Sequence, residues 1–265
     1  MRDILEDAEG AAARGDIGPG KANRERDLQK FPKKFYAKAD IKEQENGFSI
    51  ELDGRPVKTP GKQILKLPGS TSAQIVADEW NAAEEVINPL KMPATRLANT
   101  AIDGVVNAMQ AVMEDITRYA GSDLVCYRAA NPQGLVEKQR EHWDPILDWA
   151  LSELGANFET GEGIAFVTQP KESIALFGAR LKAHAEPFKL ASIHTFTSIS
   201  GSALIALALA DEHLDAETAW AAAHVDEDWN IAQWGEDFEA QERRAQKWID
   251  FSTADKLLKA VSKEI

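Results

Sequence analysis

Residues 79–105 read EWNAAEEVINPLKMPATRLANTAIDGV, and this stretch decides how the rest of the chain is interpreted. An apolar run ends at Trp80. Pro89 and Pro93 then interrupt any continuous helix, because proline lacks the backbone N–H that a helix interior needs. Thr95 can cap a second helix, in which apolar residues recur at helical spacing. The stretch therefore predicts a helix, a proline-containing elbow and a second helix.

The elbow separates candidate anchors from candidate contact residues. Trp80 lies on the apolar side of the first helix and Pro93 holds the turn, so both are predicted to be structural anchors. Direct contact of Trp80 with a partner stays open as the alternative. Arg96 and Asp103 fall on the side of the second helix away from most of its apolar stripe, and we expect them on an exposed surface.

Before the elbow, the hydrophobic pattern has a period of two. Apolar and polar residues alternate over 35–41 and 48–52, which is typical of half-buried strands; Phe35 is expected on one face and Tyr36 on the other. Asn46-Gly47 and Asp53-Gly54 are tight-turn pairs. These residues predict an antiparallel meander, which the helix that ends near Trp80 can cover.

After the elbow, the pattern becomes helical. A continuous helix is predicted from about Thr95 to Ala120, another is expected to restart at Pro145, and 203–210 are apolar on every side, as in an enclosed helix. The predicted fold class is α+β: a small β-rich domain with a covering helix at 31–92, then a larger all-α domain at 93–265. One short strand near 164–168 is expected to rejoin the sheet.

Composition excludes several partners and sites. The formal net charge of −13 opposes binding to nucleic acid or anionic lipid, since both attract positive surfaces. Cys126 is the only cysteine, so neither an intrachain disulfide nor a cysteine-rich metal site can form. The longest apolar run, 203–210, is too short to span a bilayer. We therefore expect a soluble protein without membrane or nucleic-acid partners.

The first thirty residues are rich in glycine and charge, which predicts a flexible N-terminal tail. They lack the long apolar core of a secretory signal and the acid-poor composition of a transit peptide. We expect a location in the bacterial cytoplasm.

Enzyme signatures are weak or missing in this sequence. It contains no phosphate-binding glycine loop, nucleophile elbow or HExxH pair. His224 and Asp228 share a helical face but are too few for a metal site, and Ser198 near His194 lacks a strained turn. We expect no catalytic residue, metal, cofactor or small-molecule substrate. A metal-dependent or carboxylate-based hydrolase that uses the His224 or Glu236 region remains the enzymatic alternative.

Three segments resemble a single family. They are the elbow with RLANTAID at 96–103, KKFYAKADIKEQENGFSIELDGRPVKTP at 33–60, and QWGEDFEAQERR at 233–244. In order and spacing they are similar to the assembly chaperones of the ATP synthase F1 sector that handle the alpha subunit, found in mitochondria and alphaproteobacteria. The resemblance spans nearly all of the chain after about residue 31.

The resemblance implies a non-enzymatic chaperone that binds the unassembled alpha subunit until it pairs with beta. It implies a mitochondrial matrix location for eukaryotic relatives, and it implicates the segment Trp234-Gly235-Glu236 in handling the client. Glu236 and Glu239, then Arg96 and Asp103, are the expected partner-binding residues. Trp234 is expected on the apolar face of a helix, as a structural anchor. A solvated acidic face at Glu236 and a constitutive structural subunit remain open as alternatives.

Overall fold

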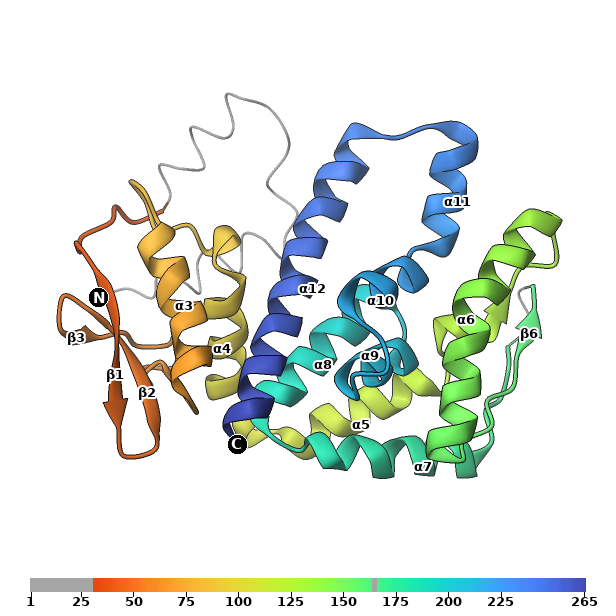
Figure 1. Ribbon diagram of the computed structural model, residues 1–265, viewed down its shortest axis with the longest axis horizontal. Coiled ribbons are helices and arrows are strands. Elements are labelled where there is room, and N and C mark those ends of the chain that lie inside the picture. Colours follow the sequence, from red (N-terminus) through yellow and green to blue (C-terminus); the bar gives the residue numbers. More distant parts are fainter. Residues whose placement is uncertain (1–30, 164–165) are drawn as a thin grey trace. The chain divides into compact units, whose positions relative to one another are not determined.

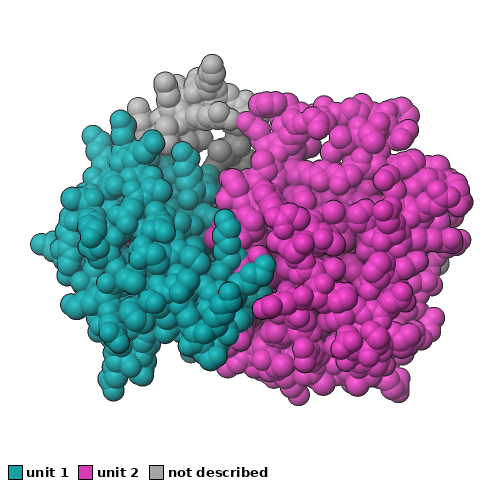
Figure 2. All heavy atoms as spheres, in the orientation of Figure 1, with its two compact units in different colours: residues 1–107, 256–265 teal, residues 108–255 magenta. Residues whose placement is uncertain are grey.

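The computed structural model describes residues 31–163 and 166–265. Within these residues the chain forms two compact units (Figure 2). Unit 1 comprises 31–107 and Lys256–Ile265, and unit 2 comprises Ala108–Asp255. A boundary was expected between residues 92 and 93, whereas the units divide after Asn107, and the end of the chain belongs to unit 1. The tail predicted at 1–30 lies outside the described residues.

Unit 1 contains an antiparallel sheet and its covering helix. In chain order its elements are β1 (Ala39–Gln44), β2 (Gly47–Leu52), β3 (Arg55–Pro56), β4 (Lys66–Leu67), α3 (Ser70–Ala82), η1 (Pro89–Lys91), α4 (Pro93–Asp103) and η2 (Val105–Asn107). Strand β2 pairs antiparallel with β1, β3 and β4, with Ala39 opposite Leu52 in the β1–β2 register. Helix α3 lies along β1 and β2 (Figure 1). The predicted α+β class, with a β-rich N-terminal part followed by a mostly helical part, is confirmed.

The first predicted strand begins later than its alternation suggested. Strand β1 starts only at Ala39, so the residues before it do not follow the pleat of the sheet. Phe35 is 74% exposed, whereas Tyr36 is buried and donates its hydroxyl hydrogen to the carbonyl of Trp80 at 2.6 Å. Burial raises the pKa of Tyr36 to about 12. Tyr36 therefore joins the core of unit 1, and Phe35 does not.

The elbow between α3 and α4 is held by a carboxylate that the sequence analysis did not single out. Oxygens of Glu79 accept hydrogen bonds from the backbone N–H groups of Ala94 and Thr95, at 2.7 and 2.8 Å, and from the Thr95 hydroxyl at 2.9 Å. Glu79 thus satisfies donors that the first turn of a helix leaves unpaired. Helix α4 begins at Pro93, so the predicted cap at Thr95 is wrong: Thr95 is buried in the first turn.

Unit 2 is mostly helical, with one short parallel pair of strands. Its elements are α5 (Met109–Ala120), η3 (Leu124–Cys126), β5 (Tyr127–Arg128), α6 (Gln133–Leu154), β6 (Gly161–Glu162), α7 (Lys171–Leu181), η4 (Lys182–His184), α8 (Pro187–Ser200), α9 (Ala203–Ala210), α10 (Ala216–Ala223), α11 (Val225–Trp234) and α12 (Phe238–Glu264), whose last residues belong to unit 1. Among the described residues no helix is both long and apolar enough to cross a bilayer.

Three predicted element boundaries differ from the structure. The helix expected from Thr95 to Ala120 is broken after Asp103, since Gly104 ends α4 and a 3₁₀ turn follows. Helix α6 runs through Pro145 without restarting, although proline removes one backbone hydrogen bond and its ring crowds the carbonyl four residues earlier. Near 164–168, the described residues 166–168 are irregular, and β6 pairs with β5 instead of the N-terminal sheet.

The core of unit 2 is built around α9, whose residues from Ala203 to Leu209 are all buried, as predicted for an enclosed helix. Asp123 is fully buried beside its first turn. Its carboxylate accepts hydrogen bonds from the backbone N–H groups of Leu204 at 2.9 Å and Val125 at 3.2 Å. Burial raises the pKa of Asp123 to about 6, although these hydrogen bonds oppose the rise. A buried carboxylate therefore satisfies the start of a helix that water does not reach.

Candidate functional site

The α11–α12 loop, residues 234–238, carries the segment that the sequence analysis associated with a client (Figure 1). Gly235 ends α11 with a positive φ of 87°, a conformation that side-chain-bearing residues rarely adopt. Its N–H donates to the carbonyl of Ile231 at 2.9 Å, which closes the last turn of α11. Gly235 therefore lies where the chain reverses between α11 and α12.

Trp234 and Phe238 flank this turn, and both face solvent. Trp234 is 87% exposed and Phe238 is 68% exposed. Trp234 was expected to be a structural anchor, but its side chain lies outside the core. The apolar pattern of α11 and α12 indicated a face to be buried, and from Phe238 to Asp250 no residue of α12 is buried. A helical pattern identifies an apolar face but does not say whether another element packs on it.

The carboxylates of the loop have different roles. Asp237 caps α12, since its Oδ1 accepts the N–H of Ala240 at 2.8 Å. Glu239 lies 3.7 Å from the guanidinium of Arg243, one turn further along α12. Glu236 is exposed and accepts a hydrogen bond from the Gln241 amide. Glu236 and Glu239 are therefore available to a partner, whereas Asp237 already stabilises the helix start.

The first half of helix α11 is fixed to the neighbouring helices α6 and α12. A Cβ placed on Gly134 of α6 would lie 2.7 Å from the Trp229 ring, so the glycine allows α11 to pack closely on α6. The amide of Gln139 donates to Asp226 at 2.7 Å, and Arg244 of α12 pairs with Asp228 of α11 at 2.5 Å. These contacts hold the two helices that carry the loop.

Arg96 and Asp103 belong to unit 1, and both make contacts within that unit. Arg96 donates through Nε to the carbonyl of Pro89 at 3.0 Å. Asp103 accepts the hydroxyl hydrogen of Thr59 at 2.6 Å and the N–H of Gly61 at 2.7 Å. Both side chains are half-buried. Asp103 was expected as an exposed contact residue, but it holds the loop after β3 against the end of α4. The local pattern could not predict this role, because Thr59 and Asp103 are 44 positions apart in the chain.

Replacing Asp103 with alanine is expected to lower the free energy of unfolding by about 1–2 kcal/mol, because it leaves the Thr59 hydroxyl and the Gly61 N–H without their acceptor. Urea denaturation of purified protein measures this change. Glu84→Ala removes an exposed carboxylate of the same unit and should have almost no effect. Equal stability of both variants would contradict the structural role of Asp103.

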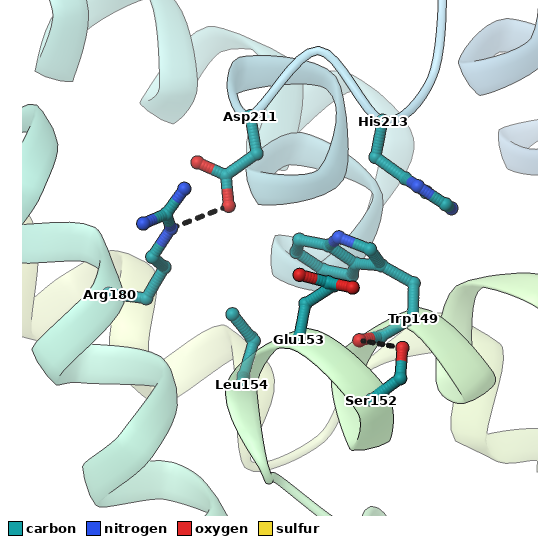
Figure 3. A pocket seen from close by; sticks show the side chains of 7 residues that line it. All are labelled: Trp149, Ser152, Glu153, Leu154, Arg180, Asp211 and His213. Atoms are coloured by element: carbon teal, nitrogen blue, oxygen red, sulfur yellow. Dashed lines mark hydrogen bonds and ion pairs between the residues drawn. The ribbon is translucent and has the colours of Figure 1, made fainter.

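A cavity of about 300 Å³ lies in unit 2, lined by Trp149, Ser152, Glu153, Leu154, Arg180, Asp211 and His213 (Figure 3). Arg180 and His184 each donate to one oxygen of Asp211, at 2.8 Å. Burial alone would raise the pKa of Asp211, but these two hydrogen bonds hold it below its ordinary value. Because both of its oxygens are paired and its pKa is lowered, the Asp211 carboxylate is a weak base, and it links α7 to the loop after α9.

His224 and Glu236, the groups of the enzymatic alternative, lie beyond opposite ends of α11. His224 is buried against Trp220, with its Nδ1 2.8 Å from the Trp220 carbonyl, and burial lowers its pKa. Neither His224 nor Glu236 lines the cavity of Figure 3. In the described ranges no three His, Cys, Asp or Glu side chains are placed to hold a metal ion.

Ser198, His194 and Asp115 do lie together on the surface of unit 2. His194 Nε2 is 3.1 Å from Asp115 Oδ2, and its Nδ1 is 3.5 Å from Ser198 Oγ. Ser198 lies within α8, where backbone N–H groups are used in the helix itself and cannot form an oxyanion hole. This arrangement is therefore a set of surface hydrogen bonds.

Comparisons with known proteins agree with the resemblance found in the sequence. The family model described as ATP12 chaperone protein matches residues 33–151. The mitochondrial protein atp12 of Schizosaccharomyces pombe is 22% identical over 215 residues, which cover 77% of this chain and 74% of that protein.

Two solved structures are similar over most of the chain. The Atu1473 protein of Agrobacterium tumefaciens is 47% identical with a TM-score of 0.85, covering 98% of this chain and 96% of that one. Atp12 from Paracoccus denitrificans is 36% identical with a TM-score of 0.80, covering 86% of this chain and 98% of that one.

Proposed function

The chain belongs to the ATP12 chaperone family, and we propose that it binds the unassembled alpha subunit of the ATP synthase F1 sector until that subunit pairs with beta. Family membership supports the broader role, that of a chaperone in ATP synthase assembly. The identity of the client as the alpha subunit comes from the resemblance of the three sequence segments.

The observation that carries the proposal is the exposed α11–α12 loop. Trp234 and Phe238 present large apolar side chains to solvent, and Glu236 lies between them in sequence. Exposed aromatic side chains of this size are costly in water and are typical of surfaces that bind another protein. We propose Glu236 and Glu239 as the charged contacts of that surface.

Binding alone accounts for the proposed activity. An orphan subunit exposes an apolar interface and aggregates, and a partner that binds this interface lowers the free concentration of the orphan. The native neighbour then displaces the chaperone because it binds more strongly. The cycle breaks no bond and needs neither nucleotide nor metal.

We propose the bacterial cytoplasm as the location of this protein, where the F1 sector is assembled. The relative from Schizosaccharomyces pombe is a mitochondrial protein, and for such eukaryotic relatives we propose the matrix. Membranes and nucleic acids are not proposed as partners, since the net charge of −13 repels both.

Glu236→Lys is expected to reduce capture of the alpha subunit at least about tenfold while leaving thermal stability unchanged, because the substituted side chain is exposed and reverses the charge of the contact surface. Co-purification with tagged, newly made alpha subunit measures capture. Glu141→Lys makes the same charge change at an exposed position of α6 and serves as the matched control.

Two results would contradict the proposal in different ways. Undiminished capture by Glu236→Lys would remove Glu236 from the binding surface. Recovery of this chain in stoichiometric amounts from the finished ATP synthase would identify a permanent subunit instead of an assembly chaperone.

A further inference from the structure

Hydrogen bonds hold the backbone on both sides of the α11–α12 loop, although its largest side chains lack packing partners in the core. Gly235 closes α11 through its N–H to Ile231, and the carbonyl of Asp237 accepts the N–H of Gln241 at 2.9 Å, while its side chain caps Ala240 at 2.8 Å. Hydrogen bonds on both sides of the turn therefore define where Trp234 and Phe238 project. A partner that binds these two rings does not first have to order the backbone that carries them.

The helices and loop that carry the two rings have a net negative charge. Residues 225–244 contain seven carboxylates and two arginines. Both arginines are used internally, Arg243 beside Glu239 and Arg244 beside Asp228. Glu236 lies between Trp234 and Phe238 in the chain and forms no ion pair with any residue that the structure describes. The surface around the rings is therefore negative, and it attracts a positively charged partner.

The same charge argues against two other occupants of the loop. A second copy of this chain would bring two acidic loops together, and like charges in an interface oppose association. An anionic membrane surface would repel the loop for the same reason, although an exposed tryptophan alone could suit a lipid interface. A segment of a different protein that contains apolar and basic residues can cover the two rings and pair with the carboxylates.

We infer that the loop docks a client segment in which apolar residues are flanked by lysine or arginine, with Trp234 and Phe238 as the side chains that bury most apolar surface. This inference rests on the proposed function, since the client is the unassembled alpha subunit. The aromatic pair supplies affinity, because large rigid rings that become desolvated dominate protein interfaces. Glu236 selects segments by charge and speeds their association.

The test measures binding of purified, unassembled alpha subunit to the full chain and to its variants. Trp234→Ala and Phe238→Ala should each weaken binding about tenfold or more, with the double variant weaker still, at unchanged thermal stability. Phe166→Ala removes a phenylalanine that is 73% exposed elsewhere in unit 2, compared with 68% for Phe238, and should bind like the unmodified chain.

A second measurement identifies the kind of segment that is bound. Overlapping synthetic peptides that cover the alpha subunit compete with it for the chain, and the strongest competitors should combine apolar residues with lysine or arginine. Exchanging those cations for glutamate should abolish competition, and raising the salt concentration should weaken it.

The outcomes separate this inference from the proposed function. If the unmodified chain binds no alpha subunit, the proposed function fails. If it binds alpha, but both aromatic variants bind equally well or acidic and neutral peptides compete best, the inference fails and the proposed function stands. Weaker binding by the aromatic variants together with competition by basic apolar peptides supports both.

Discussion

Trp80→Arg is expected to lower the free energy of unfolding by about 4 kcal/mol or more and to unfold the sheet-bearing unit at ordinary temperature. Trp80 is 5% exposed, and its ring centroid lies 5.8 Å from that of Tyr36. Arginine at this position would bury a charge without a counter-ion and would leave part of the indole volume empty. Circular dichroism during chemical denaturation measures the loss.

Two further variants isolate the cause of this effect. Gln74→Arg adds the same side chain on the exposed side of α3 and should leave stability nearly unchanged. Trp80→Phe should cost much less than Trp80→Arg, because the indole Nε1–H of Trp80 is buried without a hydrogen-bond partner among the described residues, so its removal loses no hydrogen bond. Normal stability of Trp80→Arg would contradict the anchoring role and favour direct contact of Trp80 with a partner.

Asp123→Ala is expected to be the most damaging polar substitution in unit 2, with a loss of about 2–4 kcal/mol of unfolding free energy at pH 5. Alanine leaves two buried N–H groups without their acceptor, that of Leu204 in the first turn of α9 and that of Val125 in η3. Asp123→Asn keeps one oxygen acceptor and should lose less. Denaturation of the three proteins at one pH ranks these effects.

The pH dependence of stability tests the state of the Asp123 carboxylate. Its pKa is about 6 in the folded chain, above the ordinary value of 3.8, so between these values the folded state holds a proton that the unfolded state has released. The contribution of Asp123 to the free energy of unfolding is therefore fully present below about pH 4 and is lost as the pH rises through about 6. The shift corresponds to about 3 kcal/mol at most.

Comparison with Asp123→Asn removes the other titrating groups from this measurement. The free energy of unfolding of the unmodified chain, minus that of Asp123→Asn, should fall between pH 4 and pH 7. If this difference stayed constant or rose, the hydrogen bonds to Asp123 would outweigh its burial, and its pKa would not be raised.

Local sequence patterns predicted most of the fold. The period-two pattern and its turn pairs identified the meander, and the two prolines identified the elbow, since both signals act within a few residues. The uniformly apolar stretch that forms α9 indicated an enclosed helix, because it has no polar face to turn toward solvent. The boundaries within long helices were less well predicted, as at Gly104, where tertiary contacts decide whether a helix continues.

The sequence resemblance proposes the candidate site, and the structure changes the expected surroundings of two of its residues. The resemblance alone points to residues 234–236, but Trp234, expected to be an anchor, is 87% exposed. Asp103 was expected to be exposed and instead accepts two hydrogen bonds from the loop after β3. In both cases the helical pattern identifies the apolar and polar faces of the helix. It does not show which other part of the chain packs against each face.

The sequence by itself determined the α+β class, the elbow and the family, because hydrophobic period, turn residues and motif order are all properties of neighbouring residues. Only the tertiary structure decided which aromatic side chains are covered, that Glu79 caps α4, and that Asp123 satisfies α9. These outcomes depend on pairs of groups far apart in the chain, and burial is set by the partner that folding brings to each face.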